Sequence, residues 1–390
     1  MRVFETLKCA STIAVRQGTG PFNRNIHPMY SSHRRITSKS GIQLSPAQEL
    51  SSAPTTDPAA IYKYRDSLYA ADLVSAGLSL DFFTWLDKNP STIEEICTKY
   101  GFVKRPVTVM VSLFAANDWI EERQGKFHTK DSAKEHLCEG SVWNLRPYYA
   151  AMHDRPIAKD FLQVLRTGKP AGWSGDKATG DWHKAMEQED FARRFTDAMD
   201  CRGLYLAQAL AERLDLRGRT RLLDIGAGSG VYACALAARN PHLTAVVFDQ
   251  PPVDRIAALR IAERGCAARV SAAAGDMFAG LPAGCDAHLF SNVLHDWDEP
   301  DVRRLLAASR AALPAGGLLV VHDAILTDQG GGRPGPLEAA EYSCLLMHST
   351  QGRCYAAAEL AALLDAAGFE PGPHRATAAA RGFVTGVARG

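Results

Sequence analysis

The pattern of hydrophobic and polar positions divides the chain into two parts. Between residues 61 and 117, apolar residues recur at helical spacing. Beyond residue 220, short apolar runs alternate with Ala-rich helical segments. Such alternation predicts a parallel sheet covered by helices. We therefore expect an α/β fold with a doubly wound, Rossmann-like domain after a mostly helical one.

The clearest local signal is a glycine turn between a strand and a helix. Residues 221–225 read as a buried strand, Gly226-Ala-Gly-Ser-Gly230 as the turn, and residues 231–239 as a helix. Such a turn lets backbone approach a ligand closely, beside the free N–H groups of the helix start. The next strand, residues 243–248, ends at Asp249, where a carboxylate is placed to bind a ribose diol.

These features fit either a dinucleotide or the nucleoside of S-adenosylmethionine. The dinucleotide fingerprint places its third glycine one position later than Gly230. That position is Val231, which argues against a dinucleotide.

The helical part has the element order of a winged helix. Ser91 and Glu94 form a capping-box pattern at the start of a helix that runs to Tyr100, residues 105–117 form a second helix, and residues 119–129 form a hairpin. A DNA-recognition helix should be basic, but residues 105–117 carry a single charge, Arg105. Their apolar remainder favours dimerisation, and nucleic-acid binding is the weaker alternative.

Four motifs in order resemble one known family. Leu222-Leu-Asp-Ile-Gly-Ala-Gly-Ser-Gly230, Val247-Phe-Asp-Gln-Pro251, Gly275-Asp-Met-Phe278 and Leu294-His-Asp-Trp-Asp-Glu299 are similar to motifs of S-adenosylmethionine-dependent O-methyltransferases of the caffeic acid and acetylserotonin type. The resemblance covers about residues 60–390. It implies a seven-stranded methyltransferase domain at residues 166–390 and a winged-helix-like dimerisation domain at residues 56–165, preceded by a tail and linker at residues 1–55.

The resemblance also implies where S-adenosylmethionine binds. In the family, the acid after the third strand contacts the adenine amine and the next residue packs on the ring, which here are Asp276 and Met277. Many plant relatives have a Lys four residues before the motif His, where this chain has Ser291. The expected donor-binding residues are Asp224, Gly226, Gly228, Asp249, Gln250, Asp276, Met277 and Ser291.

By the same resemblance His295 is the general base for transfer of a methyl group to a hydroxyl. A phenol has a pKa near ~10, so an imidazole that takes its proton accelerates attack. Asp323 is expected to orient the imidazole, whereas a second acid of the family is replaced by Cys354. The sulfonium donor carries its own activation, so we expect no metal. Met199, Tyr342, Met347 and His348 are the expected acceptor-pocket residues.

Composition limits which partners and compartments we expect. A net charge of +1 gives no reason to expect a polyanionic partner such as nucleic acid. The nine cysteines are scattered, which is typical of reduced thiols, and no apolar run is long enough to cross a bilayer. We expect a cytoplasmic homodimer that acts on a small aromatic molecule. The basic, Ser-rich residues 1–50 are equally typical of a mitochondrial transit peptide and of a disordered tail.

Three alternatives remain open at this point. The absence of a second acid at Cys354 favours a C- or N-methyltransferase of the same fold. A regulator would bind S-adenosylmethionine and act through its winged helix. An NAD-linked oxidoreductase is disfavoured by Val231.

Overall fold

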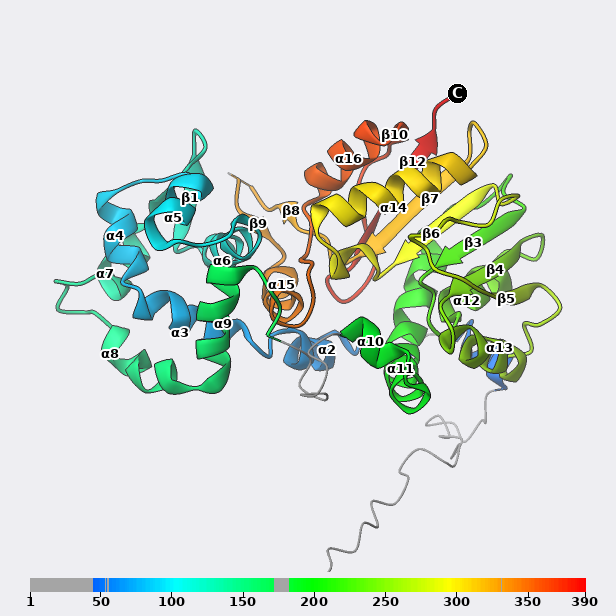
Figure 1. The fold of residues 1–390 in the computed structure, drawn as a ribbon, viewed down its shortest axis with the longest axis horizontal. Coiled ribbons are helices and arrows are strands. Elements are labelled where there is room, and N and C mark those ends of the chain that lie inside the picture. The colour runs from blue at the N-terminus through cyan, green and yellow to red at the C-terminus, as the bar shows by residue number, and fades with distance from the viewer. Residues whose placement is uncertain (1–44, 53, 55, 172–181, 331) are drawn as a thin grey trace, which may run out of the picture. The chain divides into compact units, whose positions relative to one another are not determined.

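A central eight-stranded sheet, in which seven strands form a row in the order β10-β12-β7-β6-β3-β4-β5, organises the second part of the chain (Figure 1). The computed structural model describes residues 45–52, 54, 56–171, 182–330 and 332–390. A two-residue strand, β11, pairs with β12 beside this row. The strands are β3 (Arg221–Ile225), β4 (Thr244–Asp249), β5 (Val270–Ala274), β6 (Ala287–Ser291), β7 (Leu318–Asp323), β10 (Phe369–Pro371), β11 (Arg375–Ala376) and β12 (Gly382–Ala388).

The five strands from β7 to β5 are parallel, and β12 is antiparallel to β7. Neighbouring residues of one strand point to opposite faces. In β3, Leu222 packs with α11, α12 and α13, whereas Leu223 packs with α14 and α16. Both faces are therefore covered by helices, as the doubly wound fold requires, and the seven-stranded prediction is confirmed. The covering helices are α11 (Glu189–Arg213), α12 (Val231–Arg239), α13 (Val253–Glu263), α14 (Glu299–Ala312) and α16 (Ala357–Ala366).

The N-terminal part is mostly helical and carries one short hairpin. The predicted order of helix, helix and hairpin is present as α5, α6, β1 and β2. Its elements are α1 (Pro46–Glu49), α2 (Ala59–Asp66), α3 (Ala70–Ser79), α4 (Phe82–Lys88), α5 (Ile93–Tyr100), α6 (Lys104–Ala116), β1 (Ile120–Arg123), β2 (Lys126–Thr129), α7 (Asp131–Leu137), α8 (Arg146–Tyr149), η1 (Ala150–Asp154) and α9 (Pro156–Thr167).

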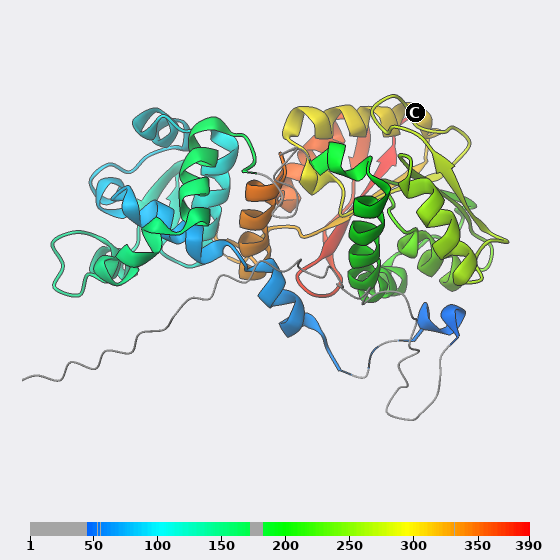
Figure 2. The ribbon, with the colours of Figure 1, turned by 60° about the horizontal axis from the view of Figure 1, so that its bottom comes forward.

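One helix from late in the sequence joins the N-terminal part. α15 (Leu337–Ser349) packs beside α2, α3, α6 and α9, as both ribbon views show (Figures 1 and 2). Its residues Ala340, Cys344 and Met347 belong to the same hydrophobic core as α3 and α6. The short elements η2 (Leu294–Asp296), β8 (Thr327–Asp328) and β9 (Pro334–Gly335) and the helix α10 (Trp182–Met186) complete the described residues.

Two local expectations need correction. The helical pattern from Ile61 to Gly77 is interrupted, because α2 ends at Asp66 and α3 begins at Ala70. The capping box lies one residue later than expected. Thr92 accepts from the backbone N–H of Glu95, and the Glu95 side chain accepts from the backbone N–H of Thr92.

The apolar surface of α6, which favoured dimerisation at the sequence level, has partners within the chain. Val107, Met110 and Phe114 are buried in the core that α6 shares with α15. Arg105 is likewise turned inward, donating from Nη1 to the Gly352 carbonyl at 2.8 Å and from Nη2 to the Gly168 carbonyl at 2.7 Å. Dimerisation therefore stays a prediction that must rest on other residues.

The predicted boundaries at residues 55/56 and 165/166 also stay predictions, and α9 runs through the second of them to Thr167. The expected transit peptide or tail lies almost entirely outside the described residues. None of the helices described is both long and apolar enough to span a membrane.

Candidate active site

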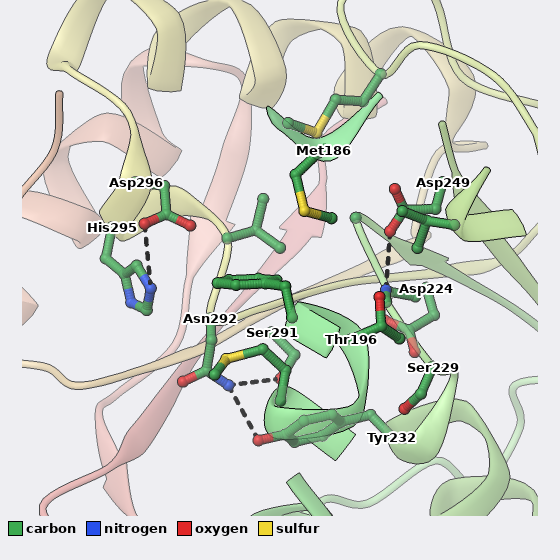
Figure 3. Close-up of a pocket in the computed structure, with 18 of the residues that line it drawn as sticks. Met186, Thr196, Asp224, Ser229, Tyr232, Asp249, Ser291, Asn292, His295 and Asp296 are labelled. Atoms are coloured by element: carbon green, nitrogen blue, oxygen red, sulfur yellow. Dashed lines mark hydrogen bonds and ion pairs between the residues drawn. The ribbon is translucent and has the colours of Figure 1, made fainter. Parts of the chain in front are cut away.

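A cavity of about 250 Å³ opens at the carboxyl ends of the parallel strands, where ligands bind in open α/β sheets. Most of the predicted site residues meet there although they come from separate strands, helices and turns, and Figure 3 labels Asp224, Asp249, Ser291 and His295 among them. The predicted residues that line it are Met199, Asp224, Gly226, Gly228, Asp249, Gln250, Asp276, Met277, Ser291, His295 and Tyr342.

The glycine turn lines this cavity through Gly226 and Gly228. Gly226, Gly228 and Gly230 all have positive φ, at 65°, 56° and 75°, a region that suits glycine. A Cβ on Gly230 would lie 2.8 Å from Cγ2 of Val247. The turn therefore needs glycine at Gly230 for its backbone angle and for its close contact with β4.

Two carboxylates flank the turn, the partly buried Asp249 and the buried Asp224. Asp249 accepts from the backbone N–H of Gly228 at 2.8 Å, and burial raises its pKa to about 6. Asp224 accepts through Oδ2 from the N–H of Ala233 at 3.1 Å, while its Oδ1 has no partner among the described residues. Burial raises the pKa of Asp224 to about 7. The glycine turn leaves room for a ligand, and the two carboxylates can accept hydrogen bonds from it. This combination fits a nucleoside with a polar amino-acid tail.

The remaining donor-side residues also border the cavity. Asp276 accepts from the backbone N–H of Phe278 at 2.8 Å, so it shapes its own turn as well as lining the cavity. Ser291, which stands where plant relatives have Lys, accepts from the side-chain amide of Asn292 at 3.2 Å.

His295 lies at the opposite end of the cavity from Asp249 (Figure 3). It is only 3% exposed, and its Nδ1 is hydrogen-bonded to Oδ1 of Asp323 at the end of β7. That Oδ1 also accepts from the N–H of Ala324 at 2.7 Å, which fixes the carboxylate. Asp323 does not line the cavity but contacts the imidazole on its Nδ1 side, and its orienting role stays a prediction.

Asp296 flanks the other nitrogen of the ring. Its Oδ1 lies 3.7 Å from Nε2 of His295, and both side chains line the cavity (Figure 3). Burial raises the pKa of Asp296 to about 6. Burial lowers the pKa of His295, but the charges of Asp323 and Asp296 outweigh this effect and hold it above the ordinary 6.5. Asp296 was not among the predicted site residues, although it follows His295 directly in the motif.

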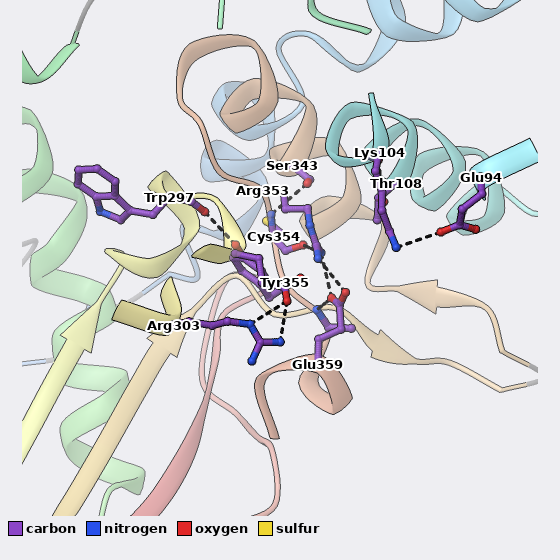
Figure 4. Close-up of polar contacts among 12 residues, drawn as sticks. Glu94, Lys104, Thr108, Trp297, Arg303, Ser343, Arg353, Cys354, Tyr355 and Glu359 are labelled. Carbon is purple, nitrogen blue, oxygen red and sulfur yellow. Dashed lines mark hydrogen bonds and ion pairs between the residues drawn. The ribbon is translucent and has the colours of Figure 1, made fainter. Parts of the chain in front are cut away.

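Cys354, which stands where the family's second acid is expected, carries a buried thiol in place of a carboxylate. Its backbone N–H donates to Oγ of Ser343 at 3.0 Å (Figure 4). Burial raises the pKa of its thiol well above the ordinary 9.0, and the nearby charge of Asp323 acts in the same direction. The next residue, Tyr355, donates from its hydroxyl to the Trp297 carbonyl at 2.9 Å (Figure 4).

The structure does not bring Met347 and His348 into the cavity. Met347 is buried in the core shared with α6, and His348 pairs with Asp160 at 3.2 Å and packs on the ring of Tyr69. Leu345 and Leu346 line the cavity instead, together with Tyr342. The expectation that Met347 and His348 line this pocket is therefore wrong.

Several cavity residues were not anticipated. Arg202 and Tyr232 lie on α11 and α12, and Asn292 donates to the Tyr232 hydroxyl at 3.0 Å. Helical periodicity alone does not distinguish such residues from core positions. Within the described part of the chain, no group of three or more His, Cys, Asp or Glu residues is placed to hold a metal ion.

Comparison with a family model and with two known proteins identifies methyltransferases in each case. A family model described as an O-methyltransferase domain matches residues 160–370. The chain is 31% identical to 3-hydroxy-5-methyl-1-naphthoate 3-O-methyltransferase of Streptomyces sahachiroi, over 77% of this chain and 86% of that protein. It is 28% identical to L-tyrosine C(3)-methyltransferase of Streptomyces lavendulae, over 68% of this chain and 67% of that protein.

A solved structure adds agreement in the fold. The O-methyltransferase family 2 protein from Planctomyces limnophilus DSM 3776, in complex with apigenin, superimposes with a TM-score of 0.77. The two sequences are 28% identical, and the match covers 87% of this chain and 98% of that one. The chain belongs to the O-methyltransferase family, and S-adenosylmethionine is its methyl donor.

Proposed function

We propose that the protein transfers a methyl group from S-adenosylmethionine to a phenolic hydroxyl of a small aromatic secondary metabolite, with His295 as general base.

 

The acceptor in this proposal is a phenol, and His295 removes its proton. The observation that carries the proposal is the pair formed by His295 and Asp323. Asp323 is hydrogen-bonded to Nδ1 of His295. The other ring nitrogen, Nε2, is therefore the one that lies near Asp296, which lines the cavity.

Each residue then has a defined task. When bound, S-adenosylmethionine supplies a methyl group on a sulfonium centre. His295 takes the proton of the acceptor hydroxyl on Nε2 while the oxygen forms its bond to the methyl carbon and the carbon–sulfur bond breaks. Asp323 stabilises the imidazolium that results, and the buried surroundings strengthen that interaction.

The relatives support this choice of acceptor. The Streptomyces sahachiroi protein is named for O-methylation of a hydroxynaphthoate, and the Planctomyces limnophilus protein was solved with apigenin. A C- or N-methyltransferase is the second candidate. It is favoured by Cys354 in place of an acid and by the likeness to L-tyrosine C(3)-methyltransferase.

Transfer of radiolabelled methyl to a panel of phenols separates the two. The panel contains apigenin, a hydroxynaphthoate and L-tyrosine, and the position of the label is mapped. O-methyl product that falls at least about a hundredfold in His295→Gln supports the proposal. His242→Gln, a histidine outside the cavity, is the matched control. Equal rates in His295→Gln and wild type refute the role of His295, and label on carbon or nitrogen supports the second candidate.

We also propose that the protein is a homodimer. Val142, Trp143 and Tyr148 lie in and beside α8, and their exposed fractions are 87%, 63% and 83%. Neighbouring exposed apolar side chains of this size are typical of protein–protein contact surfaces. This group of side chains, rather than α6, supports the proposal.

A further inference from the structure

Three arginines gather near the wall of the cavity that carries His295 and Tyr342. Arg202 of α11 and Arg65 of α2 line the cavity, and Arg381, in the turn before β12, is buried beside Tyr342. We propose that Arg202 is the centre of a carboxylate-binding subsite, and that the methyl acceptor is an aromatic hydroxy acid whose carboxylate it holds. The inference rests on the proposed function and adds the chemical class of the acceptor.

Tyr342 places Arg202 close to the proposed base. Nη1 of Arg202 donates to the Tyr342 hydroxyl at 3.1 Å. The Tyr342 ring meets the His295 ring edge-on, with 5.6 Å between the ring centroids. Arg202 is thus separated from His295 by one phenol ring. An aromatic acceptor with its hydroxyl at His295 can reach Arg202 with a second polar substituent.

The hydrogen-bonding capacity of Arg202 is not used up within the chain. Its Nε is buried and has no partner among the described residues. A guanidinium offers donors in a planar fork that matches a carboxylate, so Arg202, which lines the cavity and bonds there to a neutral hydroxyl, suits a planar anion.

The acids nearest to Arg202 have other partners. Asp66 is paired with Arg381 at 2.8 Å, and Asp296, whose charge also acts on Arg202, lies 3.7 Å from Nε2 of His295. Arg202 forms no ion pair with any carboxylate that the structure describes. Burial raises the pKa of Tyr342, so its neutral phenol does not compensate the guanidinium. A cation that lines a partly desolvated wall and has no ion pair of its own attracts an anionic ligand.

Both the acceptor and the methionyl end of the donor can supply a carboxylate. The position of Arg202 favours the acceptor. Arg202 adjoins Tyr342, next to His295, whereas Asp224 and Asp249 lie at the other side of the cavity (Figure 3). The experiment separates these two sources.

The test compares equilibrium binding of 3-hydroxy-2-naphthoate with that of 3-hydroxy-2-naphthamide, its neutral analogue, by calorimetry with saturating S-adenosylhomocysteine. Wild type should bind the acid at least about tenfold more tightly than the amide. Arg202→Gln should lose this preference, and Arg202→Lys should keep part of it. Arg213→Gln changes an exposed arginine of the same helix and should bind like wild type.

A second arm measures the donor product alone. A loss of affinity for S-adenosylhomocysteine but not for 5′-methylthioadenosine in Arg202→Gln assigns the carboxylate subsite to the donor and overturns the acceptor assignment. No preference for the acid, or no binding of either probe, together with unchanged affinity for S-adenosylhomocysteine, overturns the subsite altogether. Because the readout is binding, it is independent of whether His295 acts as a base or which atom is methylated.

Discussion

Nδ1 of His295 is hydrogen-bonded to Oδ1 of Asp323. His295 lies in η2, which follows strand β6, and Asp323 is the last residue of the neighbouring strand β7. The two strands β6 and β7 are paired in parallel, with Ser291 opposite His322. Parallel pairing therefore brings together two predicted site residues that are distant in the sequence. The contact fixes which ring nitrogen is turned away from the acid.

Asp323→Asn should lower kcat by about a hundredfold or more, because an amide can donate to Nδ1 and favour the wrong tautomer of His295. Asp323→Glu keeps a carboxylate and is the matched control, and it should retain more activity than the Asn variant. Single-turnover methyl transfer with saturating donor measures the effect. A rate in Asp323→Asn equal to that of wild type would show that the acid does not orient the base.

The pH dependence of kcat/KM should report the charges on both sides of His295. The base must be neutral to take a proton, so activity should rise with pH as His295 deprotonates. Its pKa is held above 6.5 by Asp323 and Asp296 against the effect of burial. Asp296→Asn removes one of these charges, so the pKa of His295 should fall and the rising limb should move to lower pH.

Asp215→Asn, which changes an exposed acid paired with Arg217, is the control for this profile. It should leave the limb in place. A limb that stays at the same pH in Asp296→Asn would mean that Asp296 does not act on His295 electrostatically.

Local patterns allowed the strands and the glycine turn to be predicted well. The helix after the turn begins at Val231 and ends at Arg239 as predicted, because an apolar strand, a glycine turn and an Ala-rich helix are signals within a few neighbouring residues. Asp249 and Asp276 could be placed at the cavity because each follows a strand of a parallel sheet.

The acceptor side depends on contacts that sequence does not display. In α15, Tyr342, Leu345 and Leu346 share the face at the cavity, since residues three and four apart lie on one side of a helix. Met347 and His348 fall on the opposite side of the helix. The packing of α15 against α6 determines which of the two sides lines the cavity and which is buried in the core. Arg202 and Arg381 meet Tyr342 through tertiary folding alone.

Asp249→Asn should weaken binding of S-adenosylhomocysteine by about tenfold or more, because the variant loses a charged acceptor at the end of β4. The structural bond from the Gly228 N–H, at 2.8 Å, can be kept by the amide oxygen. Titration calorimetry measures the dissociation constant, with Asp215→Asn as the surface control. An unchanged constant in Asp249→Asn would remove this residue from the donor site.

Trp143→Asp should dissociate the proposed homodimer. Trp143 is 63% exposed, so the change removes little packing within one chain, but a charge at a buried dimer contact is costly. Sedimentation velocity at several protein concentrations measures the oligomeric state. Glu122→Asp, on the exposed edge of the hairpin, is the control, and a wild-type monomer at all concentrations would refute the dimer.

Gly230→Ala should destabilise the fold more than Gly265→Ala. Both glycines have positive φ, 75° and 68°, so each substitution carries the left-handed strain of about 1–2 kcal/mol. A Cβ at Gly230 would also lie 2.8 Å from Cγ2 of Val247, whereas a Cβ at Gly265 would meet nothing within 4 Å. The overlap should add about 1–3 kcal/mol at Gly230 alone.

Denaturant unfolding of the two variants measures this difference directly, because the shared strain cancels between them. Displacement of the turn from β4 should also weaken binding of S-adenosylhomocysteine in Gly230→Ala and leave it unchanged in Gly265→Ala. Equal losses of stability in both variants would mean that the turn relaxes around the added methyl group. In that case only the backbone angle, and not the contact with Val247, requires glycine at this position.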